Sequence, residues 1–147
     1  MNRDQLRARN SFRFVTSLVQ RSQGQEKGAE LLDAFLGLSR KLPVMLQTNG
    51  LLATWGHLLA KARKGVEFEE TAQSLTAHLQ SLGLTGDGTP AALFHHWIDA
   101  QTGLSSSKLR QLTAEAVEYA VWLKRAAEAL CDAAPVAPQT SGVEVQP

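Results

Sequence analysis

Apolar residues recur every three or four positions along most of the chain, which is the spacing of one face of an α-helix. Glycines and turn-forming residues divide this pattern into separate segments. The pattern predicts six helices, over residues 4–22, 26–48, 51–64, 67–82, 90–101 and, starting within 105–113, up to about 132. No segment alternates as a strand pair would. We therefore expect an all-α fold, a single compact helical bundle of about six helices over residues 1–132.

Two sequence features should interrupt the second helical segment. Pro43 lacks a backbone N–H and crowds the carbonyl four residues earlier, so we expect a kink or a restart near Leu42. Asn49 and Gly50 both tolerate a positive φ, and the helix should end there.

The segment after Gly50 has two different sides. One side is apolar and is expected to pack in the bundle, and the other is polar and basic. The apolar side carries Leu51, Trp55, Leu58 and Ala62, and the polar side carries Thr54, His57, Lys61 and Lys64.

Residues 133–147 differ in composition from the rest of the chain. They are rich in proline, serine and glycine and have no apolar periodicity. We predict a flexible C-terminal tail that follows the bundle.

The overall composition changes this picture little. A chain of 147 residues, 44% hydrophobic and 20% charged, can form one domain with a core. No apolar run approaches the roughly 20 residues that span a membrane, the first residues do not resemble a signal peptide, and Cys131 is the single cysteine. These observations predict a cytoplasmic location.

Charge is unevenly distributed along the chain. Residues 1–65 contain 11 Lys+Arg and 4 Asp+Glu, a net charge of +7, whereas residues 66–147 contain 4 and 10, a net charge of −6. Either the basic half forms a surface for a polyanion, or the two halves interleave in space around the bundle.

The reactive side chains do not form a catalytic pattern. His95, His96 and Asp99 have helical metal-site spacing but no further ligand nearby, so we interpret them as structural. Cys131 lies at a helix end that disfavours a thiolate, and the serines at 105–107 suit helix capping. We predict no enzyme activity, no metal and no cofactor.

Basic residues remain as candidates for binding. Lys61 and Lys64 share a helical face and Arg63 lies beside them, while Arg40 and Lys41 precede the proline. Such residues can contact phosphates without reading sequence, or they can simply be solvated. Aromatic residues do not interleave with them along the chain, so stacking of bases is not indicated.

Trp122 lies apart from the apolar stripe of the last helix, on a face with Glu115, Glu118 and Arg125. It is either covered by a further contact within the bundle, for which partial burial is our expectation, or an exposed anchor for a protein partner.

Two segments resemble a known family. They are LPVMLQTNGLLATWGHLLAK, residues 42–61, and LTAEAVEYAVWLKRAAEAL, residues 112–130. In order and spacing they resemble the small all-helical subunit of type III-B CRISPR effector complexes, the Cmr complexes. The shared features are Leu-Pro near a helix end, Asn-Gly-Leu, a helix that ends in lysine, and a terminal helix introduced by Leu-Thr that contains Trp-Leu-Lys-Arg.

The resemblance implies a non-catalytic architectural subunit in antiviral defence. Several copies would stack into a filament beside the backbone subunits that hold the guide RNA, near the large subunit, and would help to bind target RNA. The residues expected to contact RNA are Arg40, Lys41, Lys61, Arg63, Lys64, Lys124 and Arg125. Lys124 could equally serve an ion pair within the bundle. The alternative is a protein-binding helical adaptor that uses Trp122 and the acidic half and does not contact nucleic acid.

Overall fold

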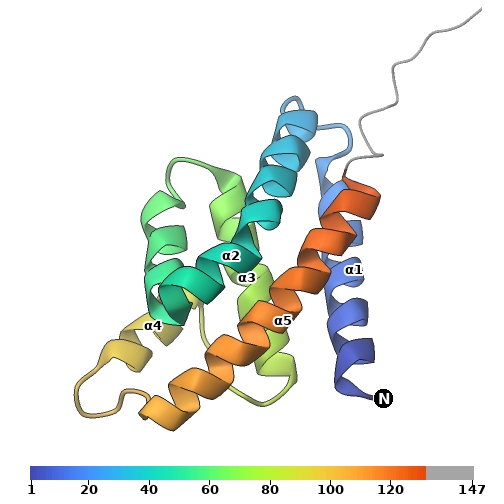
Figure 1. Ribbon diagram of the computed structural model, residues 1–147. Coiled ribbons are helices and arrows are strands. Elements are labelled where there is room, and N and C mark those ends of the chain that lie inside the picture. Colours follow the sequence, from blue (N-terminus) through green and yellow to red (C-terminus); the bar gives the residue numbers. More distant parts are fainter. Residues whose placement is uncertain (132–147) are drawn as a thin grey trace, which may run out of the picture.

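Helices make up the fold of residues 1–131, which are the residues that the computed structural model describes (Figure 1). The predicted tail at 133–147 lies outside this range. The elements are α1 (Arg3–Ser22), α2 (Gly28–Lys61), α3 (Val66–Ser81), α4 (Pro90–Ile98) and α5 (Ser106–Leu130). The all-α prediction is confirmed, with five helices where about six were expected, because the segments predicted at 26–48 and 51–64 form the single element α2.

The break expected at Gly50 is present inside α2. Gly50 has φ 84° and ψ 173°, angles that are open almost only to glycine, and the end of α2 runs in a different direction from its start (Figure 1). Backbone angles stay helical on both sides of Pro43, so the restart expected near Leu42 is wrong and the interruption lies at Gly50.

Thr54 corrects a second expectation for this segment. It is only 1% exposed, not on the polar side, and its Oγ1 donates a hydrogen bond to the carbonyl oxygen of Met45 at 3.2 Å. This bond crosses the break and gives a partner to a carbonyl at the end of the first half of α2.

The starts of the later helices follow their sequence signals. The Thr89 hydroxyl accepts a hydrogen bond from the N–H of Ala92 at 3.1 Å, with Pro90 in the first turn of α4. Ser105 caps α5 in the same way, through the N–H of Lys108 at 3.1 Å. The interpretation of the serines as a capping segment is confirmed.

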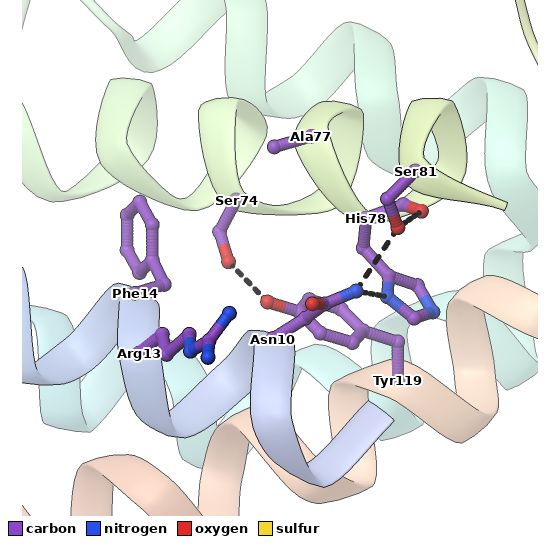
Figure 2. A pocket seen from close by; sticks show the side chains of 8 residues that line it. All are labelled: Asn10, Arg13, Phe14, Ser74, Ala77, His78, Ser81 and Tyr119. Atoms are coloured by element: carbon purple, nitrogen blue, oxygen red, sulfur yellow. Dashed lines mark hydrogen bonds between the residues drawn. The ribbon is translucent and has the colours of Figure 1, made fainter. Parts of the chain in front are cut away.

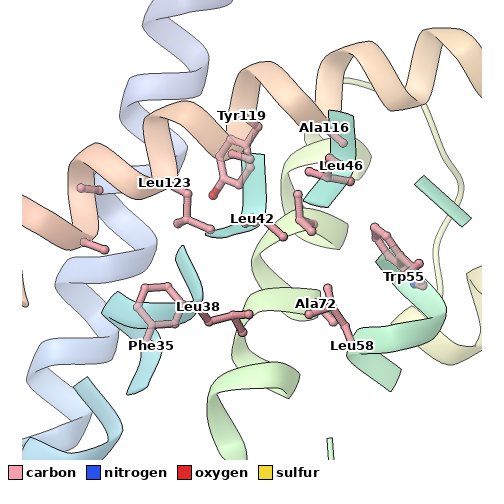
Figure 3. Packing of buried hydrophobic residues seen from close by; sticks show 14 of the residues in the cluster. Phe35, Leu38, Leu42, Leu46, Trp55, Leu58, Ala72, Ala116, Tyr119 and Leu123 are labelled. Carbon is pink, nitrogen blue, oxygen red and sulfur yellow. The ribbon is translucent and has the colours of Figure 1, made fainter. Parts of the chain in front are cut away.

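Helix α2 lies at the centre of the bundle and packs mainly against α5 and α3, while α1 packs along α5 (Figure 1). The core between them consists of leucines and aromatic rings, including Phe35, Leu42, Trp55 and Tyr119 (Figure 3). Trp55 also holds α4, because its Nε1 donates to the carbonyl of Pro90 at 2.9 Å and its ring lies 4.7 Å from that of Trp97. Among the described residues, no helix combines the length and apolar character needed to cross a membrane.

Candidate nucleic-acid interface

Three of the predicted RNA-binding residues lie around the turn that ends α2. The carbonyl of Lys61 accepts hydrogen bonds from the N–H groups of Lys64 and Gly65, at 2.8 and 3.2 Å, which closes the turn tightly. Arg63 and Lys64 are exposed and Lys61 is half-buried. Within residues 1–131 none of these three cations forms an ion pair, so their charge is directed at solvent or at a ligand.

Arg40 lies on the other side of α2, against α5. Its Nε contacts Glu128 Oε2 at 3.1 Å, and both side chains are more than one-third exposed. Such a pair contributes about 1 kcal/mol or less. Lys124 precedes Glu128 by one helical turn and is half-buried. The structure therefore places Arg40 against α5, at a glutamate one helical turn from Lys124.

Trp122 is half-buried, and the guanidinium carbon of Arg125 lies 4.7 Å from the centre of its ring. Through this cation–π contact the guanidinium of Arg125 covers one face of the Trp122 indole. Arg125 is consequently both a predicted RNA contact and the cover of the predicted partner contact.

Lys41 is brought to a different neighbourhood from Arg40. It lines a pocket with His57 from the second half of α2 and Phe68 from α3. In the sequence no aromatic residue interleaves with the basic residues, but in the folded chain α3 supplies one. Sequence reasoning missed this contact because it joins three separate segments.

The most strongly connected polar cluster of the described residues was also missed. Glu115 on α5 is only 4% exposed and lies next to two arginines of α1 and a histidine of α3. Its oxygens accept hydrogen bonds from Arg3 Nη1 at 2.8 Å, from Arg7 Nε at 2.8 Å and from Arg7 Nη2 at 2.9 Å. Glu115 thus joins α1, α3 and α5.

His78 completes the cluster from inside the bundle, and Figure 2 shows its ring beside Asn10 and Tyr119. Its Nε2 lies 2.9 Å from Glu115 Oε2, its Nδ1 lies 2.9 Å from Asn10 Nδ2, and its ring stacks on Tyr119 at 4.0 Å. Since the Asn10 amide nitrogen can only donate, Nδ1 must accept, and Nε2–H donates to the carboxylate. The neutral imidazole therefore satisfies both neighbours.

The pKa values agree with this assignment of protons. Burial alone would raise the pKa of Glu115, but the hydrogen bonds from Arg7, His78 and Arg3 outweigh it and lower the pKa to about 2. Burial lowers the pKa of His78 despite the neighbouring carboxylate. With every polar atom of the pair partnered, this cluster fastens helices together and offers no free base for proton transfer.

The histidines that resembled part of a metal site lie at the exposed end of α4. Asp99 there accepts hydrogen bonds from the N–H groups of Gln101 and Thr102, at 2.7 and 3.0 Å, and so shapes the turn after the helix. In the described part of the chain, no group of three or more His, Cys, Asp or Glu residues could hold a metal ion.

The fold and these surfaces define a class of protein, a small all-helical bundle with unpaired surface cations around one helix end and a buried ionic cluster that fastens its helices together. Comparison with known families gives the particular one. The chain belongs to the CRISPR-associated protein family Cas_Cmr5, whose family model matches residues 3–130, and is thus a small subunit of a type III-B CRISPR complex. No curated protein and no solved structure matches the chain.

Proposed function

We propose that this chain is a non-catalytic subunit that stacks with copies of itself beside the guide-RNA-bound backbone of the complex and helps to hold target RNA. The observation that carries the RNA contact is the group of cations at the end of α2, Lys61, Arg63 and Lys64, without an ion pair in residues 1–131. Such side chains gain free energy by displacing counterions from phosphates, whatever the base sequence. Selection of the target is then left to pairing with the guide.

The proposal extends to the other predicted contacts. Lys41, Lys124 and Arg125 would add further phosphate contacts, and Arg40 would do so on breaking its exposed pair with Glu128. A few contacts in one chain give weak binding, which repetition along a filament strengthens. The complex would act in the cytoplasm, in antiviral defence, together with the backbone and large subunits.

The first experiment is a pull-down of the tagged full chain from its native cells, with recovered RNA and proteins both identified. Guide RNA and the backbone subunits in the eluate would support the proposed role. An eluate with neither would contradict it.

The second experiment separates RNA binding from assembly. In the double variant Lys61→Glu, Lys64→Glu we expect the assembled complex to form normally and to bind target RNA more weakly. Normal RNA binding with failed assembly would instead support the adaptor role, in which Trp122 and its cover Arg125 meet a protein.

A further inference from the structure

A small pocket of about 230 Å³ opens between the two halves of α2 and the start of α3. Its walls combine aromatic, charged and apolar side chains. They include Gly37, Leu38, Lys41, His57, Glu67 and Phe68. The rings of His57 and Phe68 lie 6.0 Å apart at 81° to each other, in an edge-to-face arrangement.

The pocket depends on the break in α2. Lys41 precedes Gly50 and His57 follows it, and both lie on one pocket wall only because the helix changes direction between them. The turn after Lys61 then brings Phe68 to the same place on α3. The pocket thus adjoins the predicted phosphate contacts, since Lys61 follows His57 by one helical turn.

Size and chemistry restrict the ligand. The volume is below the roughly 300–1,000 Å³ of pockets for drug-sized molecules, so a small group fits. Aromatic rings and apolar walls favour a flat ring as the ligand. A phosphate is disfavoured inside, because Glu67 contributes a negative charge to the wall. Lys41 is exposed and has no ion pair among residues 1–131, so it can meet a phosphate at the rim.

We propose that this pocket binds one unpaired base of an RNA strand, stacked against His57 or Phe68, while Lys41 and Lys61 contact the adjoining phosphates. The inference rests on the proposed RNA contact and adds to it a site for a base. Because every base has a stacking face, the site would accept bases of different identity.

The test compares two RNA strands of equal length and charge, one intact and one abasic, for binding to the full chain. Phosphate contacts alone bind both strands equally. A base in the pocket should make the intact strand bind about fivefold or more tightly than the abasic one, the lower end of the range for stacking on a protein ring. In a strand with one 2-aminopurine, binding should quench its fluorescence.

Two variants remove the pocket in different ways. Phe68→Leu removes a ring. Gly37→Leu fills the pocket and changes no other wall residue. A Cβ on Gly37 meets no atom within 4 Å, and leucine favours a helix more than glycine does. Both should bring the intact and abasic strands to nearly equal affinity. The matched control is Phe12→Leu on α1, another half-buried phenylalanine, which should keep the difference.

The outcomes separate this inference from the proposed function. An intact strand that binds no better than the abasic one, or an advantage that survives both pocket variants, overturns the base site and leaves the phosphate contacts standing. If neither strand binds to the chain alone or to the assembled complex, both the base site and the proposed function are overturned. Lost assembly with unchanged RNA affinity in Phe68→Leu and Gly37→Leu would assign the pocket to a protein side chain, which also overturns the base site.

Discussion

Glu115 is the residue whose carboxylate joins α1, α3 and α5 through hydrogen bonds. A buried carboxylate is costly unless its oxygens are fully partnered, and here two arginines and a histidine provide the partners. Removing Glu115 would leave the largely buried Arg7 and the buried His78 without this partner. The cluster therefore makes folding sensitive to single substitutions far from the proposed RNA surface.

For Glu115→Gln we expect a loss of about 2–3 kcal/mol in the free energy of unfolding. Breaking a buried ion pair costs about 3–5 kcal/mol, and the partly exposed Arg3 can recover some hydration. Urea unfolding measures the change. The control is Glu118→Gln, which removes the same charge from an exposed position on the same helix and should change stability by less than about 0.5 kcal/mol. Equal effects of the two substitutions would contradict this role for Glu115.

The same cluster predicts a loss of stability in acid. The pKa of Glu115 is about 2 in the folded chain against an ordinary 4.5, so the unfolded state binds the extra proton between these pH values. The pKa of His78 is also lowered by burial, so the unfolded state gains a proton first as the pH falls through about 6.5. We expect the urea midpoint to be level between about pH 7 and 9, to fall below about 6.5 and to fall further between 4.5 and about 2.

Glu115→Gln provides the control for this pH profile. Without the carboxylate, the additional decline between pH 4.5 and 2 should become shallower. A variant profile parallel to that of the parent chain below pH 4.5 would show that other carboxyl groups cause the acid sensitivity.

Periodicity could not identify this residue as buried. The pattern places Glu115 away from the apolar stripe of its helix, yet α1 covers it. Its partners lie 112, 108 and 37 positions away in the chain, so spacing within one helix carries no information about them. Local signals were sufficient for Thr89 and Ser105, because each caps a helix through an N–H three residues ahead.

At the scale of elements, α2 shows which helix breaks a sequence specifies. A break was predicted at Asn49 and Gly50 because both residues tolerate a positive φ, and the structure has it at Gly50. The restart at Pro43 was wrong because the φ of proline suits a helix, and Leu42 and Leu46 are fully buried on both sides. Packing there maintains the helix despite one missing hydrogen bond.

Two of the glycines of α2, Gly50 and Gly37, should respond in opposite ways to the same substitution. Gly50→Ala should destabilise the chain by about 1–3 kcal/mol, because alanine is strained at φ 84° and ψ 173°. Gly37→Ala, in a regular part of the helix with open space around the added methyl group, should stabilise it by about 0.5–1 kcal/mol. Thermal and urea unfolding measure both. Stabilisation by Gly50→Ala would show that the native fold does not require these backbone angles.

At the scale of the whole molecule, the basic and acidic halves of the sequence pack against each other. Arg7 pairs with Glu115, Arg21 with Glu70 and Arg40 with Glu128, each across the two halves. The charge asymmetry along the chain is therefore partly cancelled in space. Arginine suits such pairs because its planar fork matches a carboxylate, and within residues 1–131 the lysines are left without a carboxylate partner.

This division between arginine and lysine predicts the salt dependence of the proposed RNA binding. For a single strand, the slope of log affinity against log salt is about −0.7 for each phosphate neutralised. Replacing Lys61 and Lys64 by glutamine should make the slope shallower by about 1.4, measured by titration of RNA at several salt concentrations. The control is the double variant Lys27→Gln, Lys108→Gln, which removes the same charge elsewhere and should leave the slope unchanged. An equal change of slope in the two double variants would mean that RNA binds to no particular surface of the chain.

The break at Gly50 also determines whether the two halves of α2 can share one core within a single chain. Without it, the 34 residues of α2 would form one rod of about 51 Å, whereas a domain of this size has a radius of gyration of only about 14 Å. The two ends of such a rod could not share one core. Each end would expose apolar surface that could pack against the matching surface of a second copy. The two copies would then exchange the halves of α2 by domain swapping. A single glycine thus keeps this chain a self-contained unit, so that in the proposed stack of copies the contacts would join finished surfaces and not swapped helices.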